Sequence, residues 1–419
     1  MDQRQKAIQI VKKLRVHGYQ SYFCGGSVRD FLLGHSPKDY DIVTNATPPQ
    51  LKRIFSHTIA IGEKFGVIQV LIGEDSFEIA TFRRDGLYED GRRPGTVKFC
   101  CEKEDALRRD FTINGMFFDP LSQIVIDYVA GQKDLEKKII KTIGEPRERF
   151  LEDHLRIMRA IRFSSQLNFQ IESQTWKAVC SMAHLIKNVS DERISDELRK
   201  MLCGQHPEKA LSLLHQSGLL SHILPEISIT KFQNALRMFK IGAPIASYKL
   251  AFSLLMLILK KNNATSVLSL CRQLRLSNKV TKTILNLLAW YRQFDKITSL
   301  TVASAKRIVR LSDFDLFLEL YRLVILAGDQ DRKKIYSYLE EKKKLWNSQD
   351  LSPVPFVNGQ DLIQLGLSPG PIFKKILDFM EEQQLEGKIS SRQQALEYLH
   401  LKFVEEFVEG NNIESKKNA

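Results

Sequence analysis

The sequence lacks the features that mark membrane-spanning, secreted and zinc-dependent proteins. Its most apolar stretch, LAFSLLMLILKK, is too short to cross a bilayer, and the first residues, MDQRQKAIQIVKKL, hold no apolar signal core. Its six cysteines form no Cys-x-x-Cys pair, and no histidine cluster has zinc-site spacing. These absences predict a cytoplasmic protein with reduced, mostly buried thiols and no membrane partner.

Positive charge is in excess. Lysine and arginine number 62 against 49 aspartates and glutamates, which gives a formal net charge of +13. An excess of this size favours a polyanionic partner, either a nucleic acid or an acidic membrane surface. The chain has 419 residues, 43% of them hydrophobic, which is enough for several packed domains.

The hydrophobic pattern changes character about a third of the way along the chain. In the first part, helix-like and strand-like segments alternate, and GVIQVLIG and FEIATFR, separated by GEDS, predict a β-hairpin. In the second part, helical periodicity dominates until a segment rich in proline and glycine, LSPVPFVNGQDLIQLGLSPGP. We therefore expect an α+β protein, in which a small mixed-sheet head domain is followed by an elongated all-α body.

This pattern predicts a division into four parts: a head at 1–145, a helical neck at 146–225, a helical body at 226–350 and a helical tail at 351–419. Within the head, SQIVIDYVAGQKDLEKKIIKTI is expected to form a strand, a turn and a last strand. The glycine-rich segment GLYEDGRRPGTV is expected to be a mobile loop, and the end of the chain, GNNIESKKNA, to be frayed.

Two aspartates stand close together in the segment CGGSVRDFLLGHSPKDYDIVTNATP. Asp39 and Asp41 are two residues apart, a spacing that on a strand places both carboxylates on one face. Like charges held so close normally need a cation, although a solvated turn would also hold such a pair. Glu78 in FEIATFR is either a third carboxylate for the same site or an ordinary solvent-facing residue. Nucleotidyl transfer needs metal ions held by such carboxylates.

Residues that suit a phosphate precede the aspartates. Gly25 and Gly26 let the backbone approach a ligand at a helix start, and Arg29 adds a charged fork. Most two-glycine turns bind no ligand, so this turn alone is weak evidence for a phosphate site. The evidence is stronger because Asp39 and Asp41 follow it closely.

A second polar cluster lies in RRDFTINGMFFDP. Arg108 and Arg109 can neutralise phosphate, and Asp110 can orient an arginine or a ribose hydroxyl. Asn114 can hydrogen-bond a sugar or a base, but the same stretch is also typical of a buried helix start, in which these residues serve packing.

A third cluster lies in LEDHLRIMRAIRF. The three-residue spacing of Asp153 and Arg156 predicts a pair that directs its hydrogen-bonding edges at a base. Arg159 and Arg162 continue the same face and could reach a triphosphate, unless this is a helix with surface ion pairs.

Taken in order, these motifs closely resemble those of the class II tRNA nucleotidyltransferase and bacterial poly(A) polymerase family. The resemblance rests on GGSVRD, DYD, RRDFTING and EDHLRIMRAIRF, and VSDERISDELRKML is similar to the family's motif at the end of the neck. A weaker likeness in NGQDLIQLGLSPGPIFKKILDFMEEQQLEGKISSRQQAL implies a terminal RNA-binding segment. The resemblance implies template-independent transfer of nucleotides from ATP and CTP to an RNA 3′ end, with Mg²⁺ as cofactor.

The resemblance also implies roles for single residues. Asp39 and Asp41 would hold Mg²⁺, with Glu78 as the third catalytic carboxylate. Asp153 and Arg156 in the neck would read the base of ATP or CTP. The whole candidate nucleotide-binding set is Gly25, Gly26, Arg29, Arg108, Arg109, Asp110, Asn114, Asp153, Arg156, Arg159 and Arg162.

Several activities remain open within and outside this family. The chain either adds or repairs the CCA end of tRNA, or adds poly(A) tails to RNA, or adds only the terminal A to tRNA. In IGEKF, Glu63 replaces the first of two basic residues typical of the poly(A) branch, a half match that does not decide between the branches. A long basic terminal extension, expected of a processive tailing enzyme, is lacking, which favours tRNA. The loop RRDGLYEDGRRPGTV matches the mobile loop that, in this family, helps the enzyme switch from C to A addition. Its presence argues against an enzyme that adds only C. A non-catalytic RNA-binding protein is disfavoured because all three carboxylates are present.

Overall fold

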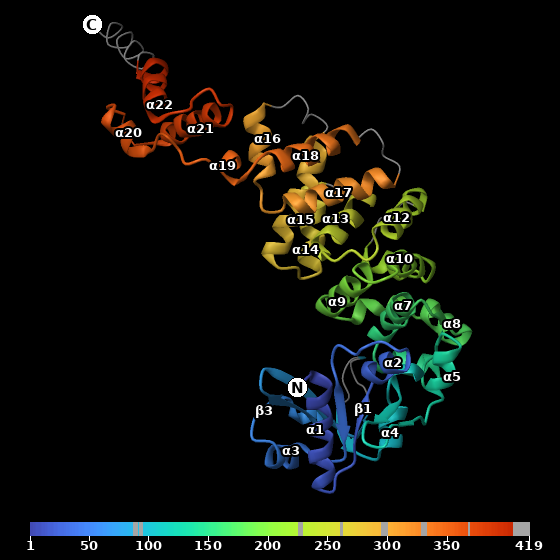
Figure 1. Ribbon diagram of the computed structural model, residues 1–419. Coiled ribbons are helices and arrows are strands. Elements are labelled where there is room, and N and C mark those ends of the chain that lie inside the picture. The colour runs from blue at the N-terminus through green and yellow to red at the C-terminus, as the bar shows by residue number, and fades with distance from the viewer. Residues whose placement is uncertain are drawn as a thin grey trace. The chain divides into compact units, whose positions relative to one another are not determined.

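The computed structural model describes residues 1–86, 91, 95–224, 229–259, 263–294, 301–327, 333–367 and 369–404. The chain forms two compact units (Figure 1). The first comprises Met1–Ala251 and Ser269–Leu276, and the second comprises Phe252–Leu268 and Ser277–Ala419. The division of the chain into four parts stays a prediction.

A seven-stranded mixed sheet is the centre of the first unit, with the strand order β3-β4-β5-β2-β1-β8-β9. Its strands are β1 (Ser21–Cys24), β2 (Asp41–Thr44), β3 (Thr58–Gly62), β4 (Val67–Ile72), β5 (Asp75–Thr81), β8 (Phe117–Asp119) and β9 (Ile124–Ile126). β2 and β5 run parallel, and the other neighbouring strands of this sheet run antiparallel. The expected hairpin of β4 and β5 is confirmed.

The two faces of this sheet have different environments. On one face, β2, β4 and β5 bury Ile42, Ile68 and Phe77, all at most 1% exposed. The opposite face carries Asp41, and there Val43 packs in a cluster with Ala106 of α4 (Glu102–Leu107). Asp41 therefore lies on the face that is only partly covered.

Short helices surround the sheet in the first part of the chain. They are α1 (Gln3–Val16), α2 (Gly26–Leu32), α3 (Pro48–Ile54), α4 and the 3-10 turns η1 (Glu63–Phe65) and η2 (Thr112–Asn114). Asp2 caps α1, and Gly18, in a left-handed conformation with φ of 81°, follows the end of this helix.

The segment after β9 differs from the sequence prediction. A helix, α5 (Gly131–Glu136), stands where only a turn was expected, and the strand β10 (Ile139–Ile140) follows it. The carboxylate of Asp127 accepts hydrogen bonds from the backbone N–H groups of Val129, Gly131 and Gln132, which starts the helix. The carboxylate of Asp127 therefore stabilises a helix in a short segment whose apolar periodicity is too weak to predict one.

The remaining strands of the described residues form two small sheets. β10 pairs in parallel with β11 (Gln170–Ile171), and β6 (Arg83–Asp85) pairs with β7 (Val97–Phe99). The predicted mobile loop lies between β6 and β7 and, apart from its ends and Gly91, falls outside the described residues. The end of the chain predicted to be frayed also falls outside them.

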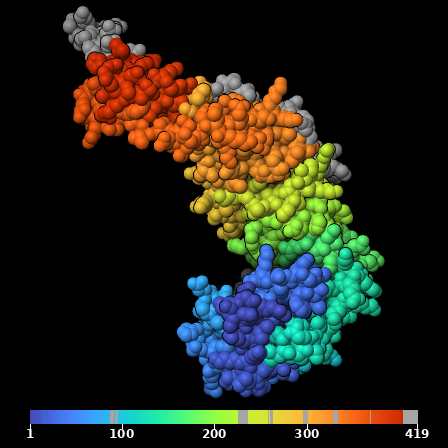
Figure 2. Space-filling model, viewed as in Figure 1, coloured from blue at the N-terminus to red at the C-terminus, as the bar shows by residue number. Residues whose placement is uncertain are grey.

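The rest of the first unit is helical. Its helices are α6 (Pro146–Glu152), α7 (Leu155–Leu167), α8 (Ser173–Ser181), η3 (Ala183–Asn188), α9 (Asp191–Leu202), α10 (Pro207–Gln216), α11 (Leu219–Ile223) and α12 (Ile229–Gly242). In Figure 2 these helices are coloured green to yellow-green, and the sheet-bearing segments are blue to cyan. α7 packs against α9 and α10 and is largely buried.

Helices α13 (Tyr248–Ile258) and α14 (Ala264–Gln273) contribute residues to both units. The second unit adds α15 (Asn278–Gln293), α16 (Val302–Val309), α17 (Phe314–Leu326), α18 (Lys333–Leu345), α19 (Ser348–Leu351), α20 (Gly359–Gln364), α21 (Pro371–Leu385), α22 (Arg392–Leu399) and η6 (His400–Val404). The segment rich in proline and glycine contains α20, which Asn358 caps.

The fold class is thus the expected one, a mixed-sheet α+β head followed by an all-α body. All six cysteines are free thiols, but only Cys24 and Cys271 are buried, so the expectation that most of them are buried is wrong. Within the described part of the chain, we find no helix that is both long and apolar enough to cross a membrane.

Candidate active site

A polar cavity of about 500 Å³ lies in the first unit, where the glycine turn after β1 meets α7. It is lined by Gly25, Gly26, Arg29, Asp41, Arg108, Arg109, Asp110, Asn114, Asp153, Arg156, Arg159, Arg162, Phe163 and Arg193. The structure therefore brings together all eleven candidate nucleotide-binding residues, and Asp41 with them. Seven arginines face three aspartates in this lining, so the cavity suits a polyanion such as a triphosphate.

The three candidate carboxylates lie around β2. The strand begins at Asp41, and Asp39 lies in the bend before it. The expectation that both aspartates lie on one strand is therefore wrong. The parallel register that pairs Ile42 with Ile79 places Glu78 beside Asp41 on the same face of the sheet. Neither Asp39 nor Glu78 lines the cavity, and both are exposed.

These carboxylates affect one another. Partial removal of water raises the pKa of Asp41, and the negative charges of Glu78 and Asp39 raise it further, against the opposing effect of Arg109. Across the described ranges, no three acidic, histidine or cysteine side chains lie close enough to form a complete metal-binding cluster. The donor set nevertheless fits a hard divalent cation, which prefers carboxylate oxygens and would neutralise the repulsion at Asp41.

The glycine turn begins at Gly25, whose φ of 68° is in the left-handed region that favours glycine. One turn of α2 later, Arg29 is held in place from two sides. Its Nη1 donates to Oδ1 of Asn114 at 2.8 Å, and its Nε and Nη2 donate to Oδ1 of Asp30 at 2.9 and 2.7 Å. Arg29 therefore presents a fixed guanidinium group to the cavity.

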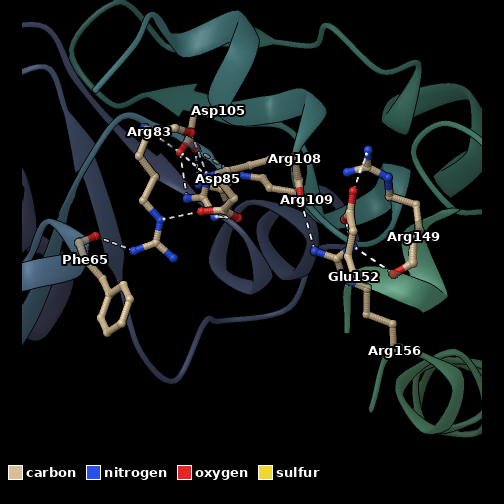
Figure 3. Close-up of polar contacts among 9 residues, drawn as sticks. All are labelled: Phe65, Arg83, Asp85, Asp105, Arg108, Arg109, Arg149, Glu152 and Arg156. Carbon is tan, nitrogen blue, oxygen red and sulfur yellow. Dashed lines mark hydrogen bonds and ion pairs between the residues drawn. The ribbon is translucent and has the colours of Figure 1, made fainter. Parts of the chain in front are cut away.

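A buried carboxylate on α4 fixes two more arginines of the cavity (Figure 3). Asp105 is fully buried, and its Oδ1 accepts hydrogen bonds from Nη2 and Nε of Arg108 at 2.7 and 2.9 Å. Its Oδ2 accepts from Nη2 and Nε of Arg109 at 3.0 and 3.2 Å, and the backbone N–H of Arg83 donates to its Oδ1. Burial by itself would raise the pKa of Asp105, but Arg109 and Arg108 lower it, so the carboxylate is ionised at neutral pH.

Cys24 lies at the end of β1, paired with Asp41 across the strands. Burial raises the pKa of this thiol to about 11, although Arg109 opposes the shift. A neutral, buried thiol is a poor nucleophile, so the cavity does not support covalent cysteine chemistry.

The pair of Asp153 and Arg156 predicted from their spacing is not formed by their side chains. Arg156 Nη1 instead donates to Oε2 of Glu152 at 2.5 Å and to the backbone oxygen of Arg149 at 3.1 Å. Its Nη2 donates to the backbone oxygen of Arg108 at 3.3 Å, which connects the start of α7 with the end of α4 (Figure 3).

Asp153 is bound by a residue that is distant in sequence. Its two oxygens accept from Nη1 and Nη2 of Arg193 on α9 at 3.1 and 2.8 Å. The reason is that α6 ends at Glu152 and α7 begins at Leu155, so Asp153 has an extended backbone between two helices. A three-residue spacing brings side chains together only within one continuous helix.

Asp110 and Arg159 form a further pair at the cavity. Arg159 Nε and Nη2 donate to Oδ2 of Asp110 at 2.8 and 2.5 Å, and the backbone N–H of Phe111 donates to its Oδ1. Burial would raise the pKa of Asp110, but Arg159 outweighs burial and lowers it to about 2.

An aromatic ring lies among the arginines of α7. The guanidinium groups of Arg29, Arg159 and Arg162 lie 5.4, 5.2 and 4.0 Å from the centre of the Phe163 ring. Arg162 Nε also donates to Oε2 of Glu197 at 2.5 Å, and both side chains are at most 10% exposed. The ring and the buried carboxylate together fix the orientation of these arginines.

Residue-level reasoning from the sequence missed Asp105, Phe163, Arg193 and Glu197. The last two lie in VSDERISDELRKML, which the sequence singled out only as a motif. Of the predicted loop, the structure describes Gly91, whose backbone oxygen accepts from the N–H of His154 at 3.1 Å.

Comparison with known protein families covers most of the chain. The Poly A polymerase head domain matches residues 21–141, and the RNA and SrmB-binding site of polymerase A matches residues 168–230. The tRNA nucleotidyltransferase domain 2 matches residues 244–399. These three matches follow the order of the head and the helical segments after it.

Similar proteins include CCA-adding enzymes. The enzyme of Ligilactobacillus salivarius is 34% identical over 425 residues, covering 97% of this chain and 98% of that protein. The enzyme of Bacillus pumilus is 44% identical over 234 residues, covering 56% of this chain and 58% of that protein. The crystal structure of the Bacillus stearothermophilus CCA-adding enzyme with CTP superposes with a TM-score of 0.80 at 28% identity and covers 100% of both chains.

The resemblance inferred from the motifs is therefore confirmed. Members of this family generally use divalent metal ions. The chain belongs to the family of CCA-adding enzymes and is a nucleotidyltransferase.

Proposed function

We propose that this protein adds or repairs the 3′-CCA end of tRNA, with CTP and ATP as nucleotide substrates. The observation that carries the proposal is the arginine-lined cavity of about 500 Å³ with Asp41 in its wall. A triphosphate needs several fixed cations around it, and transfer of its nucleotidyl group needs carboxylates beside the reacting phosphorus.

In this proposal Asp39 and Asp41 hold Mg²⁺, and Glu78 is the third carboxylate. Bound Mg²⁺ supplies neutralisation of the triphosphate and activation of the attacking 3′ hydroxyl. Arg29 and Arg109 contact the triphosphate, and their bonds to Asn114, Asp30 and Asp105 keep both guanidinium groups oriented before it binds. Such preorganisation stabilises the charge of the transition state without a cost of reorganisation.

Asp153 and Arg156 select the base. Cytosine and adenine share a pattern on their pairing edge, an exocyclic amino donor beside a ring-nitrogen acceptor. A carboxylate accepts from the amino group and a guanidinium donates to the ring nitrogen, whereas uracil and guanine present the reverse pattern. Arg193 and the backbone N–H of Leu155 both donate to Oδ1 of Asp153, whereas Oδ2 accepts only from Arg193 and keeps a lone pair for the base. Arg159 and Arg162 hold phosphate or ribose. Protein side chains thus replace a template.

The RNA partner is expected to bind through its phosphates. The formal net charge of +13 supports a nucleic acid, and shape with phosphate contacts selects a tRNA-like end. The proposal places the enzyme in the cytoplasm, which is consistent with its free cysteines. Poly(A) addition is a second candidate, because the family model that matches residues 21–141 is the Poly A polymerase head domain.

The test supplies purified protein and Mg²⁺ with tRNAs that end before CCA, after C and after CC. Each is incubated with CTP, ATP or both, and products are resolved at single-nucleotide length. Addition that stops at CCA supports the proposal, whereas a long A ladder on unrelated RNA favours poly(A) polymerase. Addition of A alone to the CC-ended tRNA indicates an A-adding enzyme.

The carboxylates are tested in the same assay. The variant Asp39→Ala/Asp41→Ala is expected to lose nucleotide incorporation, because no ligand for the metal remains at the start of β2, while it still binds tRNA in a filter assay. Glu74→Ala removes an exposed carboxylate from the turn between β4 and β5 and serves as the control. Incorporation that survives the double change contradicts the proposed metal site.

A further inference from the structure

The sheet face that carries Asp41 continues past Glu78 to the free edge at β3 (Figure 1). The register of the strands places Asp41, Glu78, Gln69 and Ile59 in one row across β2, β5, β4 and β3. Since neighbouring strands are about 4.8 Å apart, Ile59 lies roughly 14 Å from Asp41 along this row. Leu71 lies on the same face, two residues beyond Gln69 on β4.

This part of the face is apolar yet exposed. Ile59 is 47% exposed and Leu71 is 38% exposed. Nearer β1, the same face buries Tyr22 and Val43 in a cluster with Ala106 of α4. The part of the face beyond Glu78, which we call the acceptor strip, consists of Ile59, Gln69, Leu71 and Ser76; Gln69 is half-buried and the other three are exposed.

The position of the cavity determines which substrate meets this strip. The cavity takes its lining from the turn after β1, from the end of α4, from Asn114 before β8 and from α7 and its neighbours, whereas no residue of β3, β4 or β5 is among its lining residues. In nucleotidyl transfer the attacking and leaving oxygens lie roughly in line on opposite sides of the phosphorus. With the leaving phosphates among the arginines of the cavity, the attacking hydroxyl approaches from the side of β5, β4 and β3.

From this arrangement we propose that the acceptor strip holds the unpaired 3′-terminal nucleotides of the RNA, an inference that rests on the proposed function. A base has an apolar face and a polar edge, so Ile59 and Leu71 contact the faces of the bases. The amide of Gln69 both donates and accepts, and it lies between Glu78 and Ile59, where it contacts the edge or the ribose of the last nucleotide. Such contacts tolerate any base and therefore suit an acceptor end that changes with each addition.

The other occupant to consider is a second copy of this chain. A stable protein interface buries roughly 800 Å² on each partner, which four side chains do not supply. The strip also begins directly at the carboxylates, so it is continuous with the reacting centre and not a separate patch. Both arguments favour the RNA end.

The experiment compares the wild type with Ile59→Ser/Leu71→Ser in steady-state addition to a short, single-stranded RNA that ends in CC. A short RNA is used because it lacks contacts to the helical body that would mask a local loss. The KM for this RNA is expected to rise about tenfold, since two apolar contacts are removed, whereas the KM for ATP stays unchanged. Ile124→Ser on β9, at the opposite edge of the same sheet and 58% exposed, is the matched control.

A second readout does not depend on the variants. RNA with a photoreactive 4-thiouridine as its last nucleotide is expected to crosslink within residues 58–78. Crosslinks confined to the helices, an RNA KM equal to that of Ile124→Ser, or an altered oligomeric state with unchanged RNA KM would each overturn the inference. If the wild type extends no RNA, the proposed function itself fails. If only the variant and crosslink results fail, the proposed function stands and the acceptor strip does not.

Discussion

The buried carboxylate of Asp105 offers a direct test of how the cavity is held together. It contacts no part of the expected substrate, but both Arg108 and Arg109 depend on it for their orientation (Figure 3). The change Asp105→Asn keeps the shape of the side chain and removes its charge. We expect it to weaken both the fold of the head and the binding of the nucleotide.

The magnitude follows from the contacts. Removing one partner from a buried ion pair costs about 3–5 kcal/mol. Here Arg109 loses the carboxylate of Asp105, and Arg108 loses it too but keeps Asp85 at 3.6 Å. Arg108 and Arg109 have side chains that are 19% and 14% exposed, so water compensates part of the loss. We therefore expect a decrease of about 3 kcal/mol in the free energy of unfolding. Arg109 keeps its contact with the ring of Phe117, at 5.0 Å, but not its fixed direction, so the KM for CTP should rise roughly tenfold.

The measurements are urea unfolding and the KM for CTP at fixed tRNA. Asp196→Asn is the matched control, because Asp196 also binds two basic side chains, Arg199 and Lys200, but is 45% exposed. An exposed pair of this kind contributes less than about 1 kcal/mol, and it lies outside the cavity. The reasoning is refuted if Asp105→Asn matches Asp196→Asn both in its urea midpoint and in its KM for CTP.

Two further predictions concern buried pairs of the same site. Because the pKa of Asp110 is about 2 instead of 3.8, its ionised form stabilises the fold by about 2 kcal/mol above pH 4, and about half of this is lost by pH 3. Asp110→Asn should therefore be less stable than the wild type at pH 7, with a smaller difference at pH 3 in urea unfolding; a difference independent of pH would contradict this. Glu197→Gln leaves Arg162 buried without an anionic partner and should lower the free energy of unfolding by about 3 kcal/mol, measured in the same way. A urea midpoint equal to that of the wild type would show that the Arg162–Glu197 pair contributes nothing.

The fold was predictable where one local signal decided it. The alternation of apolar residues in β4 and β5 and the turn between them were enough to predict the hairpin. The prediction failed at α5, because a carboxylate outside the helix, that of Asp127, satisfies the first N–H groups, and such a cap is not part of the apolar period.

The site shows the same limit at longer range. The order of the motifs was enough to predict which residues form the site, but not which side chains bind each other within it. Those hydrogen-bond partners depend on how α6, α7 and α9 pack and not on spacing along the sequence. Asp153 illustrates this: its spacing to Arg156 predicted a helical pair, yet a break between two helices turns its carboxylate to Arg193, forty residues away. If Asp153 reads the base, Arg193 determines how its carboxylate is presented. Base selection then depends on the packing of α9 against α7 as much as on the residues that face the nucleotide.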